Sequence, residues 1–159
     1  MPPELVSLLH RDHVDLQSEL TRLLDPTMTL PEMRLALDGV RLGLVAHAEA
    51  EDIILTPFET EPSLARLVAE SRAAHLAQEG ALATLVTLRP GTRAWRDRAQ
   101  LLRELVRVHA FREAADLIPW LSRHPAYATL AGAFATERLR QLAMLQPSVP
   151  VYLAQLAAI

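Results

Sequence analysis

One five-residue spacing occurs twice in this chain and limits its fold more than any other feature. His47 is followed four residues later by Glu51, and His109 is followed four residues later by Glu113. On a helix, residues four apart lie on the same face, one turn apart. The two copies are separated by 62 residues, and a proline follows each glutamate after six residues. The spacing therefore predicts two long helices that carry related polar motifs.

The same offset relates two further histidines, His13 and His75, each of which stands 34 residues before the histidine of one motif. Overlaying residues 5–58 on residues 67–120 also aligns several leucines and valines that carry no chemistry. Two related helical hairpins explain these matches. Hairpins with short connections pack into an antiparallel, up-down-up-down four-helix bundle, in which the four histidines would meet at one level of the interior.

Composition and turn signals agree with an all-α fold. Half of the 159 residues are hydrophobic but only 4% are aromatic, which is typical of a helical bundle with a substantial core. Proline and glycine turns predict four helices that end near residues 24, 57, 88 and 119, and a fifth from about 125 to 146. We expect residues 1–123 to form the bundle. Residues 124–159 would form a C-terminal helical extension, packed on the bundle or at a homodimer contact.

Charge, cysteine usage and hydropathy exclude several functions. The net charge of −3 is spread through segments of mixed sign, so direct nucleic-acid binding is not expected. Because the chain has no cysteine, a metal would have to be held by imidazole and carboxylate groups. The N-terminus does not resemble a signal peptide, and no apolar run is long enough to cross a membrane. A cytoplasmic protein is therefore expected.

Polar residues interrupt the apolar seam of each of the four predicted helices at a similar depth. A buried carboxylate without partners costs several kcal/mol or more, which a bound metal ion offsets. Four histidines and three glutamates are too many ligands for one ion and suit two ions bridged by carboxylates. The candidate metal ligands are His13, His47, Glu51, His75, Glu79, His109 and Glu113.

These residues resemble the hemerythrin-like, or HHE cation-binding, domains, which are four-helix bundles with a non-haem di-iron centre. The resemblance covers roughly residues 4–121. It implies that Glu51 and Glu113 bridge two iron ions. It also implies that one iron is held by His13 and His47, and the other by His75 and His109.

The predicted helix that ends near residue 88 departs from the respiratory hemerythrin pattern, because Glu79 stands where a second histidine would be. Many bacterial HHE domains look similar in having a carboxylate there. The equivalent position on the predicted helix that ends near residue 24 is Gln17, a poor ligand. We expect Glu79 to complete the His75/His109 site and the other iron to keep an open position for a small ligand. Asp52 and Asp116 flank the inner faces and could orient ligands, but we favour a solvated helix face for both.

Two classes of function follow, and the sequence leaves open whether the chain is an enzyme. The first is a di-iron protein that binds or reacts with oxygen or another small diatomic ligand such as nitric oxide, as a sensor, store or oxidase. The second is a metal-stabilised structural or interaction module without small-ligand chemistry. An iron-handling role finds less support, because the chain has no accessory cysteines. Zinc and manganese stay open as alternatives to iron, since nitrogen and oxygen ligands discriminate poorly among these ions.

Overall fold

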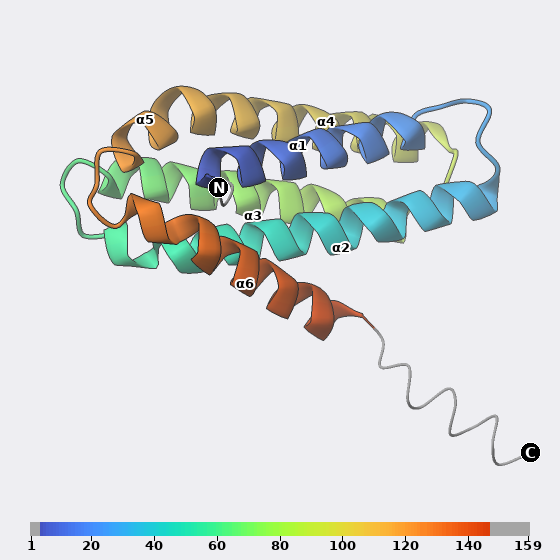
Figure 1. The fold of residues 1–159 in the computed structure, drawn as a ribbon. Helices are drawn as coiled ribbons and strands as arrows, with labels where there is room; N and C mark the ends of the chain where they lie inside the picture. Colours follow the sequence, from blue (N-terminus) through green and yellow to red (C-terminus); the bar gives the residue numbers. More distant parts are fainter. Residues whose placement is uncertain (1–3, 147–159) are drawn as a thin grey trace, which may run out of the picture.

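The computed structural model describes residues 4–146, and every regular element in that range is helical. Four long helices lie side by side (Figure 1), namely α1 (Leu5–Leu23), α2 (Leu30–Leu55), α3 (Ala65–Thr87) and α4 (Arg93–Arg112). Shorter elements follow two of them, namely the 3-10 turn η1 (Thr56–Phe58), the π-helical turn η2 (Glu113–Leu117) and α5 (Ile118–Leu121). The last described helix is α6 (Tyr127–Leu145). The all-α prediction is confirmed, and the helices form a bundle.

Two of the long helices begin where threonine side chains cap them, as the sequence predicts. Thr29 forms a capping box with Glu32, in which the Thr29 backbone N–H donates to the Glu32 carboxylate at 2.7 Å. Thr92 accepts a hydrogen bond from the backbone N–H of Trp95 at 3.3 Å. Such caps satisfy backbone donors that the first turn of a helix leaves free. Gly91, which precedes the second cap, has a φ of 80° that favours glycine.

Neighbouring helices pack in a closed arrangement around a common interior. α1 contacts α2 and α4, and α3 contacts the same two helices. Their buried apolar side chains form two clusters, one at each end of the bundle. Between the clusters, the buried interior residues are mainly polar. The polar layer is therefore shielded from solvent by leucine, valine and alanine on both sides.

The order of the two clusters along the chain reverses from one long helix to the next. On α1 the cluster containing Leu9 comes first, then His13, and then the cluster containing Leu16. On α2 the chain passes from the second cluster, through His47, back to the first. The same reversal recurs between α3 and α4. Each long helix consequently contributes a histidine to the polar layer, and on α4 this histidine, His109, lies in the last turn before η2.

Helix α6 belongs to the extension predicted for residues 124–159 and packs on α2 and α1 (Figure 1). Its Leu130 and Phe134 are buried in the same apolar cluster as Leu9. The rest of the predicted extension, residues 147–159, lies outside the described residues. Within the described range, no helix is both long enough and apolar enough to cross a membrane.

Candidate metal centre

Six of the seven predicted ligands meet in the polar layer, and all six are at least nine-tenths buried. The Nε2 atom of His47 lies 3.3 Å from Oε2 of Glu51, and the Nε2 atom of His75 lies 3.5 Å from the same oxygen. The Nε2 atom of His109 lies 3.3 Å from Oε2 of Glu113 and 3.1 Å from Nε2 of His75. The repeated spacing in the sequence therefore corresponds to one compact cluster.

Two overlapping groups of side chains in this cluster could hold a metal ion. The first group is His13, His47, His109 and Glu113, and the second is His47, Glu51, His75 and His109. Within each group, the ligand atoms all lie within 4.8 Å of one another. His47 and His109 belong to both groups. Each group mixes residues that the resemblance assigns to different ions.

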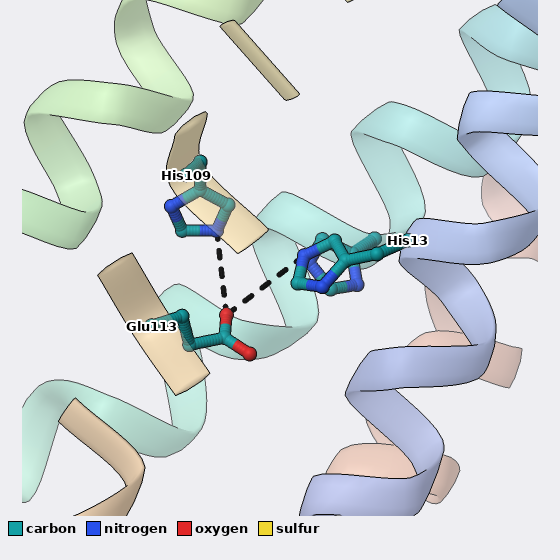
Figure 2. Close-up of side chains that lie close together, drawn as sticks. His13, His109 and Glu113 are labelled. Carbon is teal, nitrogen blue, oxygen red and sulfur yellow. Dashed lines mark ion pairs between the residues drawn. The ribbon is translucent and has the colours of Figure 1, made fainter. Parts of the chain in front are cut away.

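Figure 2 shows how Glu113 lies between two of the histidines. Its carboxylate points toward the rings of His109 and His13, which come from α4 and α1. The distance from Oε2 of Glu113 to Nε2 of His13 is 3.9 Å. One carboxylate thus faces imidazoles from two helices.

The distances between these nitrogen and oxygen atoms are close to those between ligands of one metal ion. With metal–ligand bonds of about 2.0–2.2 Å, adjacent ligands of a tetrahedral or octahedral ion are roughly 3–3.5 Å apart. The contacts of Glu51 Oε2 with His47 and His75 fall close to this range. The residues present fit a metal ion held by nitrogen and oxygen.

Unpartnered atoms provide a second test of that fit. Four buried atoms of the cluster have no hydrogen-bond partner among residues 4–146, namely Nε2 of His13, Nε2 of His47, Oε2 of Glu51 and Oε2 of Glu113. A buried polar group in that state costs about 1–3 kcal/mol, and more when it is charged. Four such costs at one place are explained if the four atoms are metal ligands.

Carboxylates orient two of the histidines from behind. Oδ2 of Asp12 lies 3.2 Å from Nδ1 of His47, and Oδ1 of Asp52 lies 2.8 Å from Nδ1 of His75. A carboxylate at Nδ1 fixes the ring and leaves Nε2 directed at the centre, which is the usual arrangement around metal-binding histidines. The expectation that Asp52 lies on a purely solvated face was wrong, because α2 and α3 pack closely enough for it to reach His75.

Further polar contacts hold Asp12 and Glu51. The Nε–H of Arg138, on α6, donates to Oδ2 of Asp12 at 2.7 Å. The hydroxyl of Ser71 donates to Oε1 of Glu51 at 2.7 Å, while Oε2 of that carboxylate faces the histidines. These contacts hold Asp12 behind His47 and restrict rotation of the Glu51 carboxylate away from the centre.

The charges of the metal-free cluster are strongly coupled through space. Burial lowers the pKa of His13 to about 2, helped by the neighbouring His47 and His109. Burial alone would lower the pKa of His47, but Asp12 and Glu51 raise it to about 9. Burial opposes protonation of His75 too, yet Glu51 and Asp52 raise its pKa to about 10. At neutral pH the protons on His47 and His75 therefore occupy positions that a metal cation would take.

The two glutamates respond to the same environment in opposite directions. Burial would raise the pKa of Glu51, but the charge of His75 and contacts with the other histidines hold it well below its usual value. Burial and the negative charge of Glu51 raise the pKa of Glu113 to about 7. The metal-free cluster therefore does not carry two full carboxylate charges at neutral pH.

Glu113 also begins the only π-helical turn in the described part of the chain. Pro119 lacks a backbone N–H and cannot donate to the carbonyl four residues earlier, so a regular α-helix is disturbed there. Wide turns of this kind are frequent at functional sites. The first motif is followed by Pro57 in the 3-10 turn η1, so both prolines coincide with a change of helix type.

The seventh predicted ligand, Glu79, is in neither group. Helix α3 turns Ser71, His75, Gln78 and Leu82 inward, in steps of four, three and four residues. Glu79 is only half-buried, one residue beyond the buried Gln78. Burial and the nearby Glu49 raise the pKa of Glu79. At the equivalent position on α1, the amide of Gln17 donates to the carbonyl of Arg103 at 3.0 Å.

The residues that sequence reasoning missed are Asp12 and Arg138. Asp12 adjoins His13 in the sequence, and a carboxylate beside a predicted ligand is the signal that could have identified it. Arg138 gave no such signal, because it lies 126 residues from its partner and outside the repeat.

The buried histidine and glutamate cluster could hold a metal ion, and its ligand types suit a divalent ion of the first transition row. No protein-family model matches this chain, and no curated protein or solved structure matches it.

Proposed function

We propose that this protein is a hemerythrin-like, non-haem di-iron protein that binds or reacts with oxygen or another small diatomic ligand such as nitric oxide. The observation that carries the proposal is the convergence of four unpartnered buried atoms, two from histidines and two from glutamates. The reversal of the two apolar clusters from helix to helix supports the antiparallel, up-down-up-down topology of this class.

The ligand roles follow from which side chains each carboxylate faces. Glu51 faces His47, His75 and His109, and Glu113 faces His13 and His109. Each glutamate contacts histidines of both halves of the repeat, which supports a bridging role between two ions. Bound iron would supply one-electron chemistry and a coordination position for a small ligand. The chain itself positions the imidazoles through Asp12 and Asp52 and keeps the centre under apolar cover.

Metal analysis of protein purified from iron-supplemented cells tests the proposal. We expect two iron ions per chain, absorption in the near ultraviolet, and a spectral change on adding azide. His75→Ala should lose much of the metal, whereas His10→Ala, which changes an exposed histidine on α1, should keep it. An iron-free, colourless wild-type preparation, or full metal content in His75→Ala, would contradict the proposal.

A metal-stabilised interaction module is the alternative, and the contact between Arg138 of α6 and Asp12 favours it. In that case the metal ties α1, α2, α3 and α4 together, Asp12 links this centre to α6, and removing the metal should destabilise the fold. The loaded protein should then show no spectral response to azide or nitric oxide. Cytoplasmic localisation and a homodimer contact in residues 124–159 stay predictions.

A further inference from the structure

A cavity of about 290 Å³ lies between α3 and α4 and reaches the candidate metal centre. We call it the α3/α4 pocket and define it by Leu67, Ala74, Leu105, Val108, His109 and Glu113. The first four side chains are apolar, and the exposed charged residues Glu70, Arg112 and Asp116 also line the pocket. His109 and Glu113 belong to the metal-binding groups and are both buried. The pocket therefore connects the surface with the ligands of the centre.

The corresponding groove on the other half of the repeat is covered. There, α6 packs over α1 and α2, and the ring of Phe134 stands 5.8 Å from that of His47. His109 is the repeat equivalent of His47, but no described helix covers it in the same way, and it lines the pocket instead. Two related grooves thus differ in access, because the pocket beside His109 is lined by candidate ligands of the centre, whereas the pocket beside Asp12 and Arg138 in the other groove is lined by none of them.

The dimensions of the pocket exceed the needs of a diatomic ligand. A volume of about 290 Å³ lies at the lower end of the range of pockets that bind organic molecules. The leucine, valine and alanine side chains that line it suit the apolar body of a ligand.

The inner end of the pocket offers an acceptor for a hydrogen bond. Glu113 lines the pocket, while its Oε2 faces His109 and His13 (Figure 2). A carboxylate has two oxygens, so one can bind a cation while the other accepts a hydrogen bond. A ligand hydroxyl in the pocket would donate to the oxygen that does not face the histidines.

We propose that the α3/α4 pocket admits a small hydroxylated organic molecule, such as a simple phenol, with its apolar body against Ala74 and Val108 and its hydroxyl directed to Glu113 beside the metal. This inference rests on the proposed function for the presence of the metal. It extends that function, because it assigns the site an organic ligand in addition to a diatomic one.

Binding of 4-fluorophenol to the zinc-loaded protein, followed by fluorine NMR, tests the pocket without iron chemistry. The wild-type protein should show saturable binding. Ala74→Phe puts an aromatic ring into the pocket and should weaken binding about tenfold or more. The matched control is Ala77→Phe, because Ala77 is exposed on the same helix and does not line the pocket. The control should bind 4-fluorophenol like the wild type.

The metal content of each variant is measured first, so that the two proposals can fail separately. A wild-type chain that takes up no metal would overturn the proposed function. A metal-loaded wild type without saturable 4-fluorophenol binding would overturn the pocket alone. Equal binding by Ala74→Phe and Ala77→Phe would also overturn it. If Ala74→Phe does not fold, Ala74→Leu replaces it and should weaken binding to a smaller extent in the same direction.

Discussion

Replacing Asp12 by alanine should destabilise the fold, because this one carboxylate joins α6 to the candidate metal centre. Its side chain is only 7% exposed and accepts hydrogen bonds from Arg138 and His47. Hydrogen bonds to charged groups contribute about 1.5–3 kcal/mol each, and Arg138 belongs at the lower end because its side chain is 31% exposed. We therefore expect Asp12→Ala to lower the free energy of unfolding by about 2–4 kcal/mol.

Urea denaturation of the metal-free protein measures this effect directly. The matched control is Asp15→Ala, which removes an exposed aspartate one turn along α1 and should change stability by no more than about 0.5 kcal/mol. A double-mutant cycle with Arg138→Ala should give a coupling energy of about 0.5–3 kcal/mol. If Asp12→Ala unfolds within about 0.5 kcal/mol of the wild type, the inferred role of Asp12 is refuted.

Lowering the pH should remove the contribution of the Asp12 carboxylate to the free energy of unfolding. Burial would raise the pKa of Asp12, but His47 and Arg138 lower it below its usual value of 3.8. A carboxylate whose pKa is lowered on folding stabilises the protein above the unfolded-state pKa and loses that effect as the pH falls through the folded-state pKa. The stability difference between wild type and Asp12→Ala should therefore be full at pH 6 and shrink below about pH 4.

Three further predictions concern the centre and its surroundings. Metal uptake at pH 7 should release protons, because His47 and His75 have pKa values of about 9 and about 10 in the metal-free protein. Calorimetry of zinc binding in two buffers of different ionisation enthalpy measures this release. Identical heats of binding in the two buffers would contradict it. Glu79→Gln should keep full metal content, whereas Glu113→Gln should lose metal on dialysis; the reverse order by metal analysis would contradict this and support Glu79 as a ligand. Leu20→Ala, at a fully buried position, should cost about 2–5 kcal/mol in urea denaturation without changing the metal stoichiometry.

The helices and the six clustered side chains could be predicted because their signals are local or periodic. Thr29 and Thr92 cap helices through contacts only three residues away, so their role is visible in the sequence. Each histidine of the cluster replaces an apolar residue in a row of helical spacing, and the repeat supplies the same row twice. The helix caps and the helical spacing of the histidines depend on neighbouring residues, so they can be predicted without knowing how the helices pack.

The place of Glu79 could not be settled in the same way. Gln78 and Glu79 are both polar, and both follow His75 at a helical spacing of three or four residues. Only the packing of α3 against α2 and α4 decides which of the two turns inward. The inward row continues through Leu82 and Leu85, and this row includes Gln78. A prediction from spacing alone therefore had two equal choices at this position.

The two halves of the repeat are alike in their ligands and unlike in what surrounds them. Asp12 orients His47, but its repeat equivalent is Ala74, which lines the α3/α4 pocket. Asp52 orients His75, and its repeat equivalent, in η2, is Ala114. Among the described residues, His13 and His109 thus have no equivalent carboxylate at Nδ1. Since His109 also faces the pocket, the less constrained ligand stands where a molecule could arrive. The difference between the halves, rather than their likeness, would then decide on which side of the centre a ligand binds.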